Sequence, residues 1–221
     1  MDKQERLPNG QYLTKKWPVL HEGEVPNTDL LSWDLRIFGL VEQERTLNWD
    51  ELMALPHEHN TSDIHCVTTW SKYDNLWEGI PFQTVLNTVV VQPECQFVMI
   101  HAEHGFTTNL PLEELLTPGV LFAYQHDGKP LAPEHGYPLR LVVPHLYFWK
   151  SAKWVRGIEL MNEDRPGFWE ERGYHMLGDP YAIDDNNPDG QRFRDDPAWF
   201  GDSSAEAERL WRAHINSLRG R

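Results

Sequence analysis

Cys66 is one of two cysteines in the chain and lies in the polar and aromatic stretch DIHCVTTWSKYDNLWEGIPF, residues 63–82. A buried cysteine usually acts as a small apolar residue, and this setting suggests three other roles. Adjacent residues of a strand point to opposite faces, so His65 and Cys66 make a poor base–nucleophile pair. His57, His59, His65 and Cys66 could together bind zinc, although their spacing matches neither CxxC nor HExxH. The third role is a thiolate ligand to a redox metal.

A basic segment lies further along the chain, in HGYPLRLVVPHLYFWKSAKWVRGIEL, residues 135–160. No acidic residue occurs between His135 and Ile158, although the whole chain has a net charge of −14. The segment carries Arg140, Lys150, Lys153 and Arg156. A guanidinium fork combined with mobile ammonium groups suits a single phosphate-like anion. The alternative is a solvated strand edge that lysines protect against pairing.

The overall charge and the hydropathy limit the classes of partner. An acidic chain is repelled by nucleic acid and by anionic membranes, so neither is expected as a partner. No apolar run reaches the ~20 residues that cross a bilayer. The start, MDKQERLPNG, contains no apolar core of a signal peptide, and Cys66 and Cys95 make no disulfide framework. These features predict a cytoplasmic protein.

The elements that position these residues alternate between short strands and short helices. Strands are expected in residues 33–41, 63–70, 97–102, 120–131, 139–144 and 154–160, and helices in 47–56, 82–90 and 110–116. Asn48 and Glu51 form a capping-box pattern at the first helix, and Asp127-Gly128 indicates a hairpin turn. The pattern predicts an α+β domain over residues 31–162 with an N-terminal arm, 1–30. Residues 163–221 are predicted to be an irregular, aromatic-rich extension that packs on the domain and ends in a helix over 203–221.

Four stretches, taken in order, resemble the molybdopterin-binding domain of the sulfite oxidase superfamily. They are WDLRIFGLV, HCVTTWS with WEGIPF, GKPLAPEHGYPLRLVVP and WKSAKWVRGIEL. The superfamily includes the catalytic subunit of periplasmic methionine sulfoxide reductase, and the chain is most similar to its short cytoplasmic members, the sulfite oxidase-like oxidoreductases. The resemblance implies a single domain of mixed sheets with short helices that binds molybdenum–molybdopterin.

The resemblance also implies roles for particular residues. Cys66 would ligate molybdenum, and His135 and Arg140 would contact the pterin and its terminal phosphate. Phe148, Trp149 and Lys150 would form a loop that holds the phosphate, with Lys153 nearby. His101 falls close to a cofactor-contacting position. Trp70, Tyr73, Trp77 and Phe106 are candidates for the walls of a small substrate pocket.

The implied activity is two-electron oxygen-atom transfer on a small substrate. Residues 46–139 contain no arginine and only Lys72 and Lys129, whereas anionic sulfite favours several arginines at the metal. Reduction of a neutral sulfoxide or N-oxide is therefore weighed equally with sulfite-type oxidation. The sequence contains no CxxCH motif, iron–sulfur cysteine set or GxGxxG fingerprint, so we expect a separate electron-transfer partner. The larger relatives' dimerisation domain has no counterpart here, which predicts a monomer. A zinc hydrolase and a non-catalytic binding module remain as alternatives.

Overall fold

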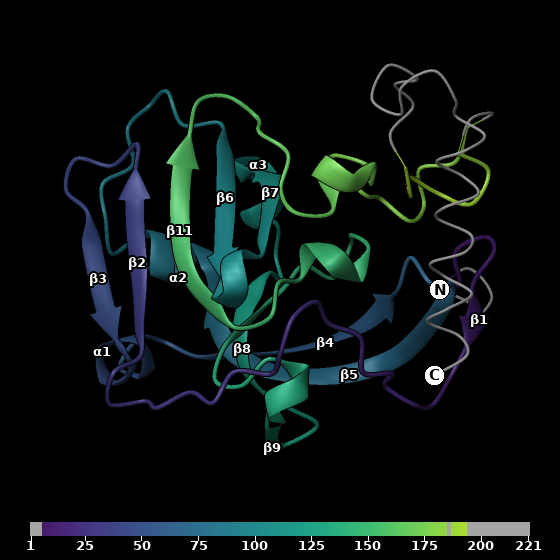
Figure 1. Ribbon diagram of the computed structural model, residues 1–221, viewed down its shortest axis with the longest axis horizontal. Coiled ribbons are helices and arrows are strands. Elements are labelled where there is room, and N and C mark those ends of the chain that lie inside the picture. The colour runs from purple at the N-terminus through teal and green to yellow at the C-terminus, as the bar shows by residue number, and fades with distance from the viewer. Residues whose placement is uncertain (1–5, 185–186, 194–221) are drawn as a thin grey trace.

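Two mixed β-sheets and the loops between them form the molecule (Figure 1). The computed structural model describes residues 6–184 and 187–193. The first sheet has the order β3-β2-β11-β6-β7, and the second has the order β1-β5-β8-β10, with β4 paired to β5 and β9 to β8. In each sheet one parallel pair, β2 with β11 and β1 with β5, joins otherwise antiparallel strands.

The strands are short except for β5. Their bounds are β1 Tyr12–Leu13, β2 Asp34–Gly39, β3 Arg45–Asn48, β4 Glu58–His65, β5 Trp70–Pro81, β6 Phe97–Ala102, β7 Thr107–Pro111, β8 Leu121–His126, β9 Lys129–Pro130, β10 Arg140–Val142 and β11 Val155–Met161. The predicted strands overlap β2, β6, β8, β10 and β11, and the hairpin turn after His126 is present. The strand predicted over residues 63–70 covers only the last three residues of β4 and the turn that leads into β5. The strands β1, β3, β5 and β7 were not predicted from the sequence.

Helices make up a small part of the described chain. They are α1 Trp49–Met53, α2 Phe82–Leu86 and α3 Leu112–Leu115, with single 3₁₀ turns η1 Glu103–Gly105, η2 Pro133–His135, η3 Phe148–Lys150 and η4 Glu170–Arg172. The three predicted helices are confirmed, and so is the capping box. Asn48 accepts from the Glu51 amide, and the Glu51 carboxylate accepts from the Asn48 amide, both at 2.9 Å. Within the part of the chain that the structure describes, no helix has the length and apolar character needed to cross a bilayer.

The main core lies between the two sheets. Leu35, Ile37 and Ile158 of the first sheet pack in one cluster with Phe122 and Leu141 of the second, and all five side chains have an exposed fraction of 0%. In a strand with one buried face, apolar residues alternate with polar ones, and this pattern allowed the strands that carry these positions to be predicted from the sequence. The predicted α+β class with mixed sheets and short helices is confirmed.

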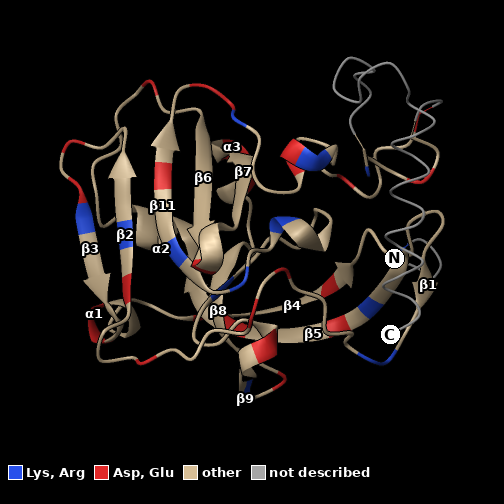
Figure 2. Ribbon diagram, in the orientation of Figure 1, with Lys and Arg blue, Asp and Glu red and all other residues tan. Residues whose placement is uncertain are grey.

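The arm lies against the second sheet, and the described part of the extension runs from the β7 edge of the first sheet to the η3 region. The arm adds β1 to the β5 edge, because Tyr12 and Thr14 donate from their backbone amides to Thr69 and Ser71 carbonyls at 2.9 Å. The described part of the extension, which contains η4, runs beside the η3 region (Figure 1). Its aromatic side chains pack onto that region. The predicted terminal helix, 203–221, lies outside the described residues. The boundaries 1–30, 31–162 and 163–221 stay predictions. Figure 2 shows acidic positions spread over many of the connecting loops, in keeping with the net charge.

Candidate cofactor-binding site

A cavity of about 660 Å³ lies where the arm, the β4–β5 turn, the η3 region and the extension meet. Five of the eight predicted site residues line it, namely Cys66, Arg140, Phe148, Trp149 and Lys153. The arm contributes residues 17–22, and the extension contributes Trp169 and Tyr174. Segments from four separate parts of the sequence therefore form one site.

Cys66 lies in the tight turn that joins β4 to β5. Its backbone amide donates to the Trp70 carbonyl, and its carbonyl accepts from the Thr69 amide, both at 2.9 Å. The Cys66 Sγ lies 3.1 Å from the Thr68 hydroxyl. Thr69 has a φ of 79°, an unusual conformation for a β-branched residue. Burial raises the pKa of the Cys66 thiol. A bound metal cation would offset that effect, because metal ligation favours the thiolate.

Arg140, on β10, is a buried cation that points into the cavity region. Its Nη1 donates to the His135 carbonyl at 2.9 Å and its Nη2 to the Ser151 carbonyl at 2.8 Å. Its guanidinium carbon lies 4.2 Å from the Phe148 ring centroid. The side chain has an exposed fraction of only 1%, and burial lowers its pKa to about 9.

Lys153 is the second cation that lines the cavity. Its Nζ donates to the carbonyls of Leu20, at 2.7 Å, and Glu134, at 2.6 Å. Burial, with the nearby charge of Arg140, lowers its pKa to about 7. Among the described residues, no carboxylate lies within ion-pair distance of Arg140 or Lys153. Two neighbouring buried cations without a counter-anion are costly, so the pair fits a phosphate group.

His135 borders the same region without lining the cavity surface. Its ring stacks on Trp17, with centroids 3.8 Å apart and an interplanar angle of 8°. Its Nδ1 is buried and has no hydrogen-bond partner, and the same is true of the Trp70 Nε1 at the cavity wall. Burial, together with Lys153 and Arg140, lowers the pKa of His135 to about 4. Buried polar atoms normally have partners, so these two fit the polar edge of a bound heterocycle.

Besides His135, two predicted residues do not line the cavity. Lys150 is fully buried, and its Nζ lies 2.6 Å from the Glu170 Oε1. His101, on β6 of the first sheet, lies 2.8 Å from the Glu159 carboxylate through its Nε2. The structure therefore shows both side chains with carboxylate partners of their own.

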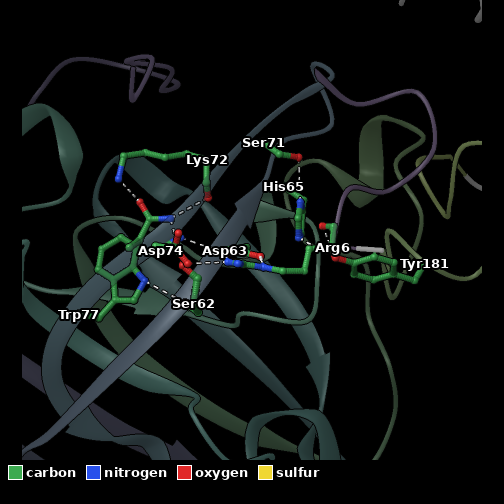
Figure 3. Close-up of polar contacts among 10 residues, drawn as sticks. Arg6, Ser62, Asp63, His65, Ser71, Lys72, Asp74, Trp77 and Tyr181 are labelled. Carbon is green, nitrogen blue, oxygen red and sulfur yellow. Dashed lines mark hydrogen bonds and ion pairs between the residues drawn. The ribbon is translucent and has the colours of Figure 1, made fainter. Parts of the chain in front are cut away.

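The four candidate zinc ligands do not come together. His57 contacts the Tyr124 hydroxyl and the Met53 carbonyl, whereas His65 lies at the other end of β4. The buried ring of His65 contacts the hydroxyls of Ser71 and Tyr181, at 2.9 and 3.0 Å (Figure 3). In the residues that the structure describes, no three His, Cys, Asp or Glu side chains form a metal-binding group.

Several residues that line the cavity were not predicted from the sequence. Trp17 and Leu20 come from the arm, where a tryptophan among prolines was the only signal of a packing role. Of the four suggested wall residues, Trp70 and Phe106 line the cavity, but Tyr73 and Trp77 do not. Trp77 is fully buried and meets Trp17 edge to face at 5.4 Å, so it supports the site from behind. Tyr73 lies under the Arg6 guanidinium at 4.4 Å.

Comparison with known proteins identifies the family of the chain. The family model for the oxidoreductase molybdopterin binding domain matches residues 22–169. The uncharacterized oxidoreductase YuiH of Bacillus subtilis is 49% identical over 181 residues, which cover 81% of this chain and 91% of YuiH. The chain belongs to the oxidoreductase molybdopterin-binding domain family, within the sulfite oxidase superfamily. As a member of this family it is an oxidoreductase that binds a molybdenum–pterin cofactor.

More distant relatives have names that specify an activity. A putative protein-methionine-sulfoxide reductase subunit of Azospira oryzae, YedZ1, is 29% identical and covers 71% of this chain. The sulfite oxidase of Arabidopsis thaliana is 26% identical and also covers 71%. The chain spans 60% and 49% of the lengths of these two proteins.

A solved structure shows the same fold. The sulfane dehydrogenase SoxCD of Paracoccus pantotrophus superposes with a TM-score of 0.62 at 22% identity, over 69% of this chain and 43% of that one. This similarity confirms the predicted architecture of the fold as well as its class.

Proposed function

We propose that the protein catalyses two-electron oxygen-atom transfer on a small substrate, with Cys66 as the protein ligand of molybdenum. The observation that carries the proposal is the cavity itself, which places a cysteine thiol and two uncompensated cations on one surface. In this assignment Arg140 and Lys153 hold the terminal phosphate, and Phe148 and Trp149 form the wall of the loop around it. His135, stacked on Trp17, would face the pterin. When bound, the cofactor supplies the oxygen-atom transfer chemistry itself.

We further propose reduction of a neutral sulfoxide or N-oxide as the preferred reaction, with sulfite-type oxidation as the second candidate. The two cations that border the cavity near Cys66 are both assigned to the phosphate. Most of the remaining lining is apolar or aromatic, including Val67, Trp70 and Phe106. Such a wall favours an uncharged substrate over sulfite, because an anion would lose its water without gaining a counter-charge. The name of the Azospira relative points the same way.

Electrons would be exchanged with a separate protein. The sequence contains two cysteines, too few for the four that an iron–sulfur cluster needs. Both cysteines are free thiols in the structure, which suits a reducing compartment, and we propose a cytoplasmic monomer.

The metal ligand is tested by comparing Cys66→Ser with Cys95→Ser. Both cysteines have an exposed fraction of 9%, but Cys95 packs in the main core and does not line the cavity. Cys66→Ser should keep the pterin, lose oxygen-atom transfer and change the Mo(V) spin-resonance signal. Cys95→Ser should leave all three unchanged. A molybdenum-loaded Cys66→Ser protein with full activity and the wild-type signal would contradict the assignment.

The substrate class is tested with the same preparations. We expect reduction of dimethyl sulfoxide, methionine sulfoxide or trimethylamine N-oxide with a reduced viologen as electron donor to be faster than oxidation of sulfite with ferricyanide. Faster turnover of sulfite would favour the second candidate.

A further inference from the structure

A fully buried ion pair joins the η3 turn to the extension. The Lys150 Nζ lies 2.6 Å from the Glu170 Oε1, and both side chains have an exposed fraction of 0%. The same Glu170 oxygen accepts from the Trp149 indole at 2.9 Å and from the Thr108 hydroxyl at 3.2 Å. The Lys150 ammonium also donates to the Met176 carbonyl at 2.5 Å. In Figure 2, η3 and η4 lie one above the other with basic and acidic positions on them.

The position of Glu170 in the sequence is informative. The family model ends at residue 169, so Glu170 and Met176 both lie in the extension beyond the matched domain. They nevertheless supply the counter-charge and one hydrogen-bond acceptor for a lysine inside that domain. Residues 163–193 therefore do more than cover an apolar surface.

The η3 turn that this ion pair holds carries part of the cofactor site. Ser151, directly after Lys150, accepts from the Arg140 guanidinium through its carbonyl and from the Val143 amide through its hydroxyl oxygen. Phe148, at the start of the turn, packs on the Arg140 guanidinium. Trp149 lines the cavity while its indole nitrogen is bonded to Glu170. Displacing Lys150 would thus disturb Arg140 from two sides.

Lys150 is the only charged group of the turn. Removing Glu170 leaves its ammonium buried without a contacting carboxylate, and Asp164, further away, is then the remaining opposite charge. Such a buried cation is strongly destabilising, whereas removing both charges together is often neutral. This difference gives a specific signature for the pair. If Lys150 itself bound the phosphate, removing Glu170 alone would not weaken cofactor binding, because the freed ammonium would still attract the anion.

We propose that Glu170 is a positioning residue, which neutralises Lys150 and so fixes the 148–151 loop in the conformation that binds the cofactor. Lys150 then acts through the loop rather than by touching the phosphate. The proposal rests on the site assigned to Arg140 and the loop above.

The test measures molybdenum and pterin per folded chain in variants produced with cofactor synthesis active. Glu170→Gln keeps an oxygen that can accept from Trp149 but loses the charge, and we expect occupancy to fall about tenfold, the effect of ~1.4 kcal/mol. The double variant Lys150→Met with Glu170→Gln should recover to within about twofold of the wild type, and should exceed either single variant. Leu35→Ala, in the buried core of the first sheet, is the control that lowers thermal stability without lowering occupancy.

Two results would overturn the proposal. One is wild-type occupancy in Glu170→Gln, and the other is a double variant that is as depleted as the single variant, which would mean that Lys150 contacts the cofactor. If Glu170→Gln does not fold, the double variant decides the matter, and its failure to fold or load would equally count against the proposal. Arg140→Ala, measured in parallel, separates this question from the site itself, because retained cofactor there would contradict the proposed phosphate site and not the role of Glu170.

Discussion

Gly136 allows Arg140 and Lys153 to approach each other. A Cβ atom at this position would lie 3.0 Å from the Arg140 Cβ and 3.3 Å from the Lys153 Cβ. Its φ of 113° is a conformation that side chains disfavour. The spacing of the two cations therefore depends on a residue that carries no chemistry of its own.

We predict that Gly136→Ala separates the cations and lowers cofactor occupancy about tenfold, the change that ~1.4 kcal/mol of lost binding produces. The measurement is molybdenum per folded chain. Gly128→Ala is the matched control, because Gly128 also has a positive φ, of 73°, but a Cβ there would meet no atom within 4 Å. An equal loss of cofactor in the two variants would show that strain, not the spacing of the cations, limits binding, and wild-type occupancy in Gly136→Ala would contradict the prediction.

The sequence was informative about residues whose neighbours in the chain define their chemistry. Cys66 and Arg140 lie in motifs that resemble the family, and the structure brings both to one cavity. The partner of Lys150 was not predictable, because Glu170 lies 20 positions away in an irregular segment, where no periodicity indicates which residue faces which. Trp17 was not predicted as a site residue for the same reason, because it also lies in an irregular segment.

At the scale of elements, α1 shows how local signals predict local structure. Its capping box was predicted from Asn48 and Glu51 alone and is present in full. We predict that Asn48→Ala lowers the free energy of unfolding by about 0.5–2 kcal/mol, as measured by urea denaturation. Cofactor occupancy per folded chain should not change, because α1 contributes no residue to the cavity. A matching loss of cofactor would mean that the first sheet and the site are coupled.

Strand β5, which was not predicted, shows the limit of local sequence signals. Its Ser71 and Asn75 are fully buried, which the sequence alone does not suggest. Both have partners from elsewhere, Ser71 the His65 ring and Asn75 the Ser62 carbonyl. Asp74, with a φ of 56°, reads as a turn residue within the strand. Tertiary hydrogen bonds therefore decide the conformation here, and they are not visible in a pattern of apolar residues.

At the scale of the whole molecule, one buried and two partly buried histidines contribute to how the protein responds to acid. Burial lowers the pKa of His65, His126 and His135 from 6.5 to about 4 in each case. Between these values the unfolded chain binds protons that the folded chain does not. Acid therefore favours unfolding, and stability rises as the pH rises through this window.

We predict that the free energy of unfolding of the cofactor-free protein falls as the pH is lowered from about 6.5 to 4. His126→Gln should reduce the slope by about one proton, because glutamine keeps a donor for the Asn75 side chain but does not titrate. Asp127, Lys72 and Arg140 surround His126 and remain in the variant. Urea unfolding at several pH values gives the slope, and an unchanged slope in His126→Gln would refute the prediction.

The N-terminal arm has a consequence for the order in which the protein matures. Residues 12–20 leave the ribosome early, yet they dock on the backbone of Thr69 and Ser71, on the His135 ring and on the Lys153 ammonium. Their docking surface is complete only after most of the chain has been synthesised and folded. The arm can therefore complete its side of the cavity wall only after residue 153 has been made, and until it docks the cavity is open on that side. A pterin that reaches the newly made protein before the arm docks would meet a cavity that is open on this side.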